Sequence, residues 1–370
     1  MRQFLIFICL ISSLLSSAQS QEKEKKERKA TPQMNNSVSE PLREDIQSVS
    51  VSKSAQSQKR QKIENVSSSL SVTINQASRM KTRKSFTKDQ IRELNKGVQE
   101  LKNIDKTSFE YHLYNYLKSP YNFDQIQSLR EAESLNAYNF AVLSSFSAYH
   151  YIQGNEADLN NYLSKLYQGK YFNDNLLKNA ELTLKSLPKN AVLISHGKDD
   201  TYPLLINQKI KKLRSDVEII SLDHLLSEDY RLKLMKKGFD VPEREIIDTE
   251  FLKQIVLNNL NKNIVCSNTL PSPYLKAIDA KLFVIGFGFS SENIRSINVS
   301  FYEDELVNIL PTLLSNGNSI TLSNCLPLLF DVRNYYINKK KYKKSEEIEV
   351  WLRTIGELLG KVEQINSLLK

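Results

Sequence analysis

Between residues 188 and 315, short apolar runs alternate with segments that have the apolar spacing of helices. The runs AVLIS, VEIISL and NIVCSN are about five residues long, and amphipathic segments separate them. Runs of this kind are typical of parallel strands, because the crossover helices cover both faces of the sheet. The pattern predicts an α/β domain at 188–315 with a small parallel sheet covered by helices, to which KLFVIGFGF adds a further strand.

Helical periodicity dominates on both sides of this domain. Residues 86–187 contain segments of about 11–16 residues with apolar positions three and four apart, as amphipathic helices require. Thr87 and Gln90 have the form of a capping box before the first of these segments. Residues 316–370 predict a C-terminal helical hairpin joined by a lysine-rich turn.

Part of the first helical region, AESLNAYNFAVLSSFSAYHYIQGNEADLNNYLSKLY, resembles a tetratricopeptide unit. Asn136 stands where a helix pair closes, and Gly154-Asn155 lies in the turn between two helices. The resemblance implies a scaffold that binds other proteins. The alternative is a helical cap that packs on the α/β domain.

The chain begins with features of an export signal. Arg2 is followed by an apolar segment from Phe4 to Leu15 and by small residues that end at Ala18. This order predicts a signal peptide at 1–18, because the apolar segment is too short for a membrane span. No later run is long and apolar enough to span a membrane, so we expect a soluble mature protein in the periplasm or outside the cell.

Residues 19–85 contain no Phe, Tyr or Trp and are rich in Ser, Gln, Lys and Glu. Such a composition predicts a disordered basic linker, because too little apolar surface is available to offset the entropy of ordering. The net charge of +9 comes mostly from this segment, which carries +7 between residues 19 and 84. The folded part is nearly neutral and therefore does not predict a nucleic-acid groove.

Removal of a signal peptide at 1–18 leaves two cysteines, Cys266 and Cys325. Two cysteines in an exported protein could pair, but they do not form a disulfide framework. Both have apolar neighbours, which favours buried free thiols.

Three segments of the α/β region resemble a known family when taken together. Gly197-Lys-Asp-Asp-Thr-Tyr-Pro-Leu204 is similar to a Gly-Asp-Asn-Asp-Thr-aromatic-Pro-Leu run, and Arg214-Ser-Asp-Val-Glu-Ile-Ile-Ser-Leu222 is similar to the segment that follows it. Lys262 to Thr269 with Leu282 to Phe287 is similar to the third. The chain thus resembles the C-terminal soluble α/β domain of bacterial protein O-mannosyltransferase-like membrane proteins, in which helical repeats also flank this domain.

This resemblance implies a fold and a location on the export side of the membrane. It does not carry over catalysis, since the glycosyltransferase chemistry of that family belongs to a multi-span membrane portion that is absent here. Lys198 and Asp199 also depart from the family pattern.

Polar residues follow the first two predicted strands, where ligands of parallel α/β sheets bind. The candidate ligand-binding residues are His196, Gly197, Lys198, Asp199, Asp200, Thr201, Asp223 and His224. Two imidazoles and three carboxylates at one sheet edge could bind a divalent ion, and a carboxylate could act as a general base. No ligand spacing fixes a metal site, so we expect no metal and no cofactor and assign no catalytic residue.

The same residue types also make turns and helix caps. Asp199 or Asp200 could cap a helix that starts near Tyr202, Pro203 suits a first helical turn, and Gly197 permits a tight turn. A similar structural role is expected for Gly286-Phe287-Gly288, which lacks the third glycine of a dinucleotide fingerprint and indicates close strand packing.

Two function classes therefore stay open. The first is an exported, non-enzymatic accessory protein that binds other proteins of the cell envelope. The second is a ligand-binding protein or metal-dependent enzyme that acts on a glycan or a small phosphorylated substrate through the loop 196–201. The sequence does not specify the partner, the ligand or the oligomeric state.

Overall fold

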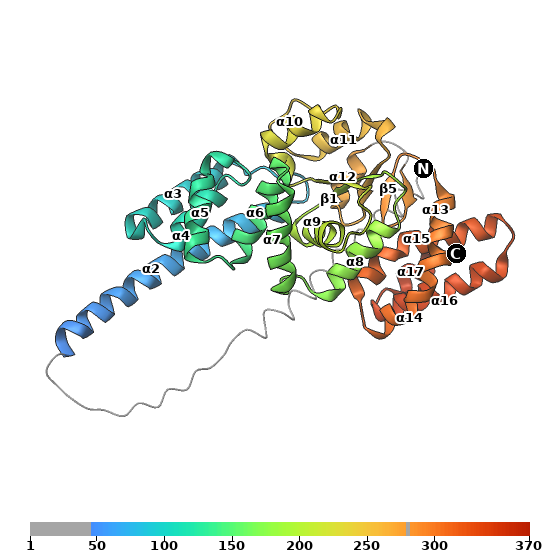
Figure 1. Cartoon of the computed structure of the whole chain (residues 1–370). Helices are drawn as coiled ribbons and strands as arrows, with labels where there is room; N and C mark the ends of the chain where they lie inside the picture. The colour runs from blue at the N-terminus through green and yellow to red at the C-terminus, as the bar shows by residue number, and fades with distance from the viewer. Residues whose placement is uncertain (1–45, 279–281) are drawn as a thin grey trace. The chain divides into compact units, whose positions relative to one another are not determined.

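The computed structural model describes residues 46–278 and 282–370 (Figure 1). The predicted signal peptide and residues 19–45 of the predicted linker lie outside these ranges. The chain divides into two compact units. We call residues 81–85 and 143–370 the α/β unit, and residues 46–80 and 86–142 the helical unit.

The helical unit contains a helix that the composition of residues 19–85 did not predict. This helix, α2 (Ile46–Ser78), extends through the segment expected to be a disordered linker, so that expectation is wrong for residues 56–78. Ile63 and Leu70 of α2 are buried against Leu94, Val98 and Leu101. The segment folds because apolar residues recur at helical spacing along α2 and because the helical unit supplies the apolar partners that they need.

Three further α-helices and a short 3-10 helix (Phe123–Gln125) follow in this unit. The predicted capping box is confirmed at Thr87, whose hydroxyl accepts the Gln90 N–H while the Gln90 side chain accepts the Thr87 N–H. The closest helix pairs are α2 with α3 and α4 with α5. The helices are α3 (Lys88–Asp105), α4 (Phe109–Leu117) and α5 (Ile126–Leu135).

The boundary between the units does not fall at residue 187, where the change of periodicity placed it. It falls at residue 142, within α6 (Phe140–Gln153), and residues 316–370 belong to the same unit as the sheet. The physical reason is packing, since α8 lies against both α9 and α15. The helices of the region 143–370 after α6 are α7 (Glu156–Gln168), α8 (Asp174–Lys185), α9 (Lys198–Leu205), α10 (Glu228–Lys236), α11 (Thr249–Leu257), α12 (Ser272–Ala277), α13 (Arg295–Phe301), α14 (Val307–Ser315), α15 (Ser319–Asn338), α16 (Tyr342–Leu358) and α17 (Val362–Leu369).

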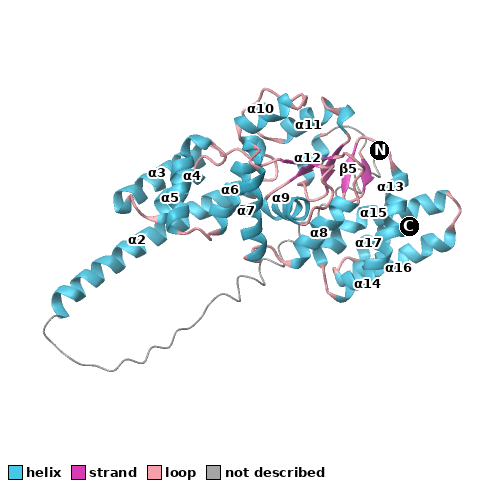
Figure 2. Ribbon diagram, viewed as in Figure 1, coloured by secondary structure: helices cyan, strands magenta, loops and turns pink. Residues whose placement is uncertain are grey.

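The α/β unit is built on a five-stranded sheet in the order β2-β1-β3-β5-β4 (Figure 2). The strands are β1 (Val192–Ser195), β2 (Glu218–Ser221), β3 (Ile264–Ser267), β4 (Phe283–Ile285) and β5 (Gly288–Ser290). As predicted, β1 runs parallel to both β2 and β3, and in Figure 2 helices lie on both sides of the strands. The sheet is mixed, however, because β5 is antiparallel to β3 and to β4.

The described part of the run KLFVIGFGF, from Leu282 on, folds as the β4–β5 hairpin and not as one strand. Gly286 turns the chain with a φ of +56°, a conformation that favours glycine. A Cβ at Gly288 would lie 2.6 Å from Val265 Cγ1, so this glycine lets β5 approach β3. The two glycines therefore serve close strand packing, as the sequence indicated.

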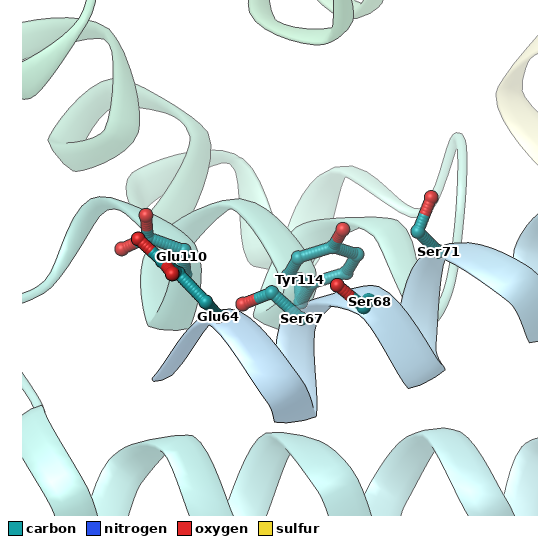
Figure 3. A pocket seen from close by; sticks show the side chains of 6 residues that line it. All are labelled: Glu64, Ser67, Ser68, Ser71, Glu110 and Tyr114. Carbon is teal, nitrogen blue, oxygen red and sulfur yellow. The ribbon is translucent and has the colours of Figure 1, made fainter. Parts of the chain in front are cut away.

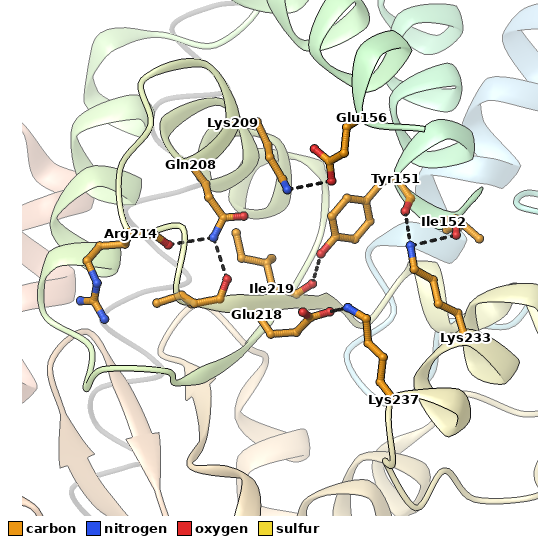
Figure 4. A network of polar contacts seen from close by, with 11 residues as sticks. Tyr151, Ile152, Glu156, Gln208, Lys209, Arg214, Glu218, Ile219, Lys233 and Lys237 are labelled. Atoms are coloured by element: carbon orange, nitrogen blue, oxygen red, sulfur yellow. Dashed lines mark hydrogen bonds and ion pairs between the residues drawn. The ribbon is translucent and has the colours of Figure 1, made fainter. Parts of the chain in front are cut away.

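Strand β2 is an edge strand of the sheet, and side chains donate hydrogen bonds to backbone carbonyl oxygens on its outer side (Figure 4). The Tyr151 hydroxyl donates to the Ile219 carbonyl oxygen at 2.5 Å, and the Gln208 side-chain amide donates to the Val217 carbonyl oxygen at 2.7 Å. Lys233 Nζ donates to the carbonyl oxygens of Tyr151 and Ile152 at the end of α6. These contacts hold α6 along β2 and blunt the edge against pairing with another chain.

Both remaining cysteines are buried free thiols, as their apolar neighbours indicated. Burial raises the pKa of Cys266 and of Cys325 to about 12. Within the described ranges, no helix is long and apolar enough to cross a membrane.

Candidate functional site

The carboxyl ends of β1 and β2 lie side by side, as the prediction of a common rim requires. Ser195 is the register partner of Ser221, so the residues after both strands begin at the same level of the sheet. The N–H of Gly197 donates to Asp223 Oδ2 at 2.6 Å, which ties the loop after β1 to the loop after β2. The structure thus brings His196, Gly197 and Asp223 together.

A lysine from far back in the sequence completes this group. Lys84 Nζ lies 3.0 Å from Asp223 Oδ1 and 2.7 Å from His196 Nε2. The Lys84 side chain is only 2% exposed. An ammonium group is a donor without acceptor capacity, so Lys84 donates to both the carboxylate and the imidazole nitrogen.

Burial and neighbouring charges shift the pKa values of two members of this triad, His196 and Asp223. Burial lowers the pKa of His196 to about 4, and the neighbouring Lys84 ammonium acts in the same direction. Burial alone would raise the pKa of Asp223, but Lys84, His196 and the Gly197 N–H hold it well below its usual range. At neutral pH His196 is therefore a neutral imidazole and Asp223 is a carboxylate.

The Asp200 carboxylate joins three segments beside the triad. Its Oδ2 accepts the His196 N–H at 3.0 Å and the Thr269 hydroxyl at 2.8 Å, and so links α9 to the loop after β3. Burial raises the pKa of Asp200 to about 6, while these hydrogen bonds limit the rise. The predicted capping role is corrected, because α9 begins at Lys198 with Gly197 at the N-cap position.

Two further predicted residues, Lys198 and Thr201, point into the same polar interior. Lys198 Nζ donates to the Ser144 hydroxyl at 3.2 Å, and burial lowers the Lys198 pKa. The Thr201 hydroxyl lies 2.9 Å from Ser195 Oγ and 3.2 Å from Ser221 Oγ, and so bridges β1 and β2.

Two predicted residues are not part of the group. Asp199 is exposed in the first turn of α9, where its charge favours the helix N-terminus. His224 is buried among the rings of Tyr151, Tyr202 and Tyr230, and burial lowers its pKa to about 4. Pro203 lies inside α9 and not in its first turn.

Lys84 is held by a short strap, which we define as residues 81–85. The Lys84 N–H donates to the Ile247 carbonyl oxygen at 2.7 Å, and the Thr249 N–H donates to the Thr82 carbonyl oxygen at 3.2 Å. The Ser85 hydroxyl accepts the Ile247 N–H at 3.1 Å. The strap therefore runs along residues 247–249 and positions Lys84 at the carboxyl ends of β1 and β2.

Sequence reasoning missed Lys84, Ser144 and Thr269. Lys84 is one of many lysines in a basic segment without aromatic residues, and its spacing from His196 carries no signal. The one local hint is that it stands two positions before Phe86, where aromatic residues return. Ser144 and Thr269 are single hydroxyl residues in a helix and a loop, which is the commonest context for these types.

Polar groups of this site are satisfied by contacts within the protein. Each oxygen of Asp223 and one oxygen of Asp200 accepts hydrogen bonds from the protein itself. In the part of the chain that the structure describes, no three His, Cys, Asp or Glu side chains gather to form a candidate metal site. These contacts fasten the strap to the ends of strands β1, β2 and β3.

Two surface hollows lie away from this network. One, of about 170 Å³, is lined by Glu228, Arg231, Leu232 and Met235 of α10 and by residues 242–245. The other, of about 430 Å³, belongs to the helical unit, where Glu64, Ser67, Ser68 and Ser71 of α2 face Glu110 and Tyr114 of α4 (Figure 3). None of the predicted site residues lines either hollow.

Fold and site together define a small mixed α/β domain whose strand ends are closed by an internal ion pair. The family model described as TMEM260-associated domain 2 matches residues 177–313, from α8 to α14, and so includes the whole sheet. This match is loosely consistent with the resemblance to O-mannosyltransferase-like membrane proteins. No curated protein and no solved structure matches the chain.

Proposed function

We propose that this chain is an exported, non-enzymatic accessory protein of a bacterial cell envelope that binds other envelope or secreted proteins. The observation that carries the proposal is the closed state of the strand ends. Lys84, His196 and Asp223 satisfy one another where an α/β enzyme would hold its substrate. Export is supported by the sequence of residues 1–18.

A surface on α10 supports binding to another protein. Leu232 and Met235 are 46% and 39% exposed there. Leu232 and Met235 line the 170 Å³ hollow, whose other lining includes the charged residues Arg231 and Glu228. An apolar centre with a charged rim is the usual anatomy of a protein–protein interface.

The test compares capture of envelope proteins by the mature chain, by Leu232→Asp/Met235→Asp and by Val350→Asp/Leu358→Asp. The second pair is also exposed, at 61% and 42%, and changes the charge equally. We expect a protein that is captured by the mature chain and by the control pair but not by the α10 pair. Identical capture by all three chains would contradict the proposal, and so would a protein found in the cytoplasm with residues 1–18 still attached.

One observation favours the second candidate, a ligand-binding protein or enzyme that uses the loop 196–201. His196, Lys198 and Asp200 all have shifted pKa values at the strand ends, and such clusters are enriched at functional sites. A ligand would have to displace Lys84. Thermal stabilisation by a glycan fragment or a sugar phosphate, abolished in Asp200→Asn and retained in the exposed control Asp199→Asn, would favour this candidate over the first.

A further inference from the structure

The turn between α15 and α16 gathers lysines at the tip of a helical hairpin. Five of the six residues at 339–344 are lysines, and the sixth is Tyr342. All six are exposed, and Tyr342 is 58% exposed. In Figure 1 the turn lies at the outer end of the red hairpin, away from the sheet of the same unit. We call residues 339–344 the basic tip.

These lysines are badly placed for the stability of α16. A helix N-terminus carries partial positive charge and favours carboxylates. The first turn of α16 contains no acidic residue, and its N-cap residue, Lys341, makes no side-chain capping bond. By contrast, α3, α4, α7, α8 and α11 each have a side-chain cap and an acidic residue in the first turn. Helices α5 and α14 also lack a side-chain cap and an acidic first turn, so what distinguishes α16 is the cluster of lysines at its start.

The protein neutralises only part of this charge. Glu303 pairs with Lys344, and the charge of Lys341 also acts on Glu303. Glu346 and Glu347 follow in the next turn of α16 and are exposed. Lys339 lies over the ring of Tyr335 with its Nζ 5.9 Å from the centroid, a contact that leaves its charge intact. Lys340 and Lys343 form no ion pair within the described ranges.

The shape and chemistry of the basic tip fit a flat anionic surface. A convex turn has no groove for a polymer strand, whereas its lysines can reach several headgroups at once as flexible point charges. Tyrosine suits the headgroup level of a bilayer, because its ring is apolar and its hydroxyl is polar. From these contacts and charges, we propose that the basic tip binds the surface of membranes that contain anionic lipids.

The experiment measures sedimentation of the full-length mature chain with vesicles of phosphatidylcholine, with and without phosphatidylglycerol. The test variant is Lys340→Gln/Lys341→Gln/Lys343→Gln. The matched control is Lys189→Gln/Lys236→Gln/Lys276→Gln, which removes the same charge from exposed positions elsewhere in the α/β unit. The segment before residue 46 is identical in all three proteins, so differences report the substituted lysines.

We expect the test variant to bind anionic vesicles about 100-fold more weakly, at about tenfold for each 1.4 kcal/mol and about 1 kcal/mol for each lysine. The control should lose much less, binding should weaken with salt, and Tyr342→Ser should reduce binding at unchanged charge. Equal losses in test and control variants would overturn the proposal, and so would binding of the tip to soluble polyphosphate but not to vesicles. The capture experiment on α10 does not involve these lysines, so the two proposals can fail separately.

Discussion

At the scale of single residues, Lys84 explains why the polar loop after β1 has the geometry it has. Its ammonium compensates the Asp223 carboxylate, which otherwise would be a charge in a largely water-excluded interior. Removal of one partner of a buried pair costs more than the pair contributes, since the remaining charge loses its compensation. The importance of Lys84 is therefore best measured through the free energy of unfolding.

Lys84→Ala should lower the free energy of unfolding by about 3–5 kcal/mol, because Asp223 is left without its cation. Lys81→Ala, which removes an exposed lysine from the same strap, should change it by less than about 0.5 kcal/mol. Denaturant unfolding measures both. Ethylammonium added to Lys84→Ala should restore part of the lost free energy of unfolding. If Lys84→Ala leaves the free energy of unfolding unchanged, the pair does not stabilise the fold.

The histidines predict how stability depends on pH. His224 has a folded pKa of about 4, below its unfolded value near 6.5, so the stability that it confers is lost as the pH falls from about 6.5 to about 4. His196 acts in the same sense, and Asp200, with a raised pKa of about 6, acts in the opposite sense. The lowered pKa values of Asp223 and Asp216 act in the same sense as those of the histidines, so acidification should destabilise the protein.

His224→Phe should therefore reduce the loss of unfolding free energy between about pH 7.5 and about pH 4.5 by about 2 kcal/mol. Urea unfolding at the two pH values measures the difference. His112→Phe in the helical unit serves as the control for replacing a histidine by an aromatic ring. An acid sensitivity unchanged by His224→Phe would show that this imidazole titrates normally in the folded protein.

At the scale of elements, hydrophobic spacing predicted those structures that depend on neighbours along the chain. The strands after Ala191 and Asp216 and the helix cap at Thr87 were predicted for that reason. Helix α2 was missed because the absence of aromatic residues was weighed above the stripe that contains Ile63 and Leu70. Contacts across long sequence separations, such as that of Lys84 with His196, leave no local pattern to detect.

The β4–β5 hairpin provides a prediction at this scale. Gly286 has a φ of +56°, and a Cβ there would lie 2.5 Å from the Ser186 carbonyl oxygen. Gly286→Ala should cost about 3 kcal/mol of unfolding free energy, from backbone strain and a clash with α8's end. Gly317→Ala has a similar φ of +61° with nothing within 4 Å, so it should cost only about 1 kcal/mol. Equal costs at the two glycines would mean that the clash relaxes freely.

At the scale of the whole molecule, the two units have separate apolar cores. The core of the helical unit contains α2 residues, which makes α2 part of a folded body and not a tether. Because each unit is compact by itself, we expect each to unfold in its own transition.

Leu70→Ala tests this organisation. The side chain is 3% exposed, so its loss should destabilise the helical unit by about 2–5 kcal/mol and leave the transition of the α/β unit in place. Val72→Ala, at a position that is 54% exposed on the same helix, should have little effect. Calorimetry resolves the two unfolding transitions. If Leu70→Ala shifts the midpoint temperature of neither transition, α2 is a linker and not part of a folded core.

The strap also governs the order in which the protein can be completed during synthesis. Its Ser85 hydroxyl meets a partner 162 residues further along, at Ile247, and Lys84 meets His196 after 112 residues. During synthesis the N-terminus leaves the ribosome first, so Lys84 stays exposed to solvent until the second half of the protein has been made. Folding of the sheet edge is thus a late event. An α/β fragment that starts at residue 143 would lack Lys84, the cation that pairs with Asp223 at the strand ends.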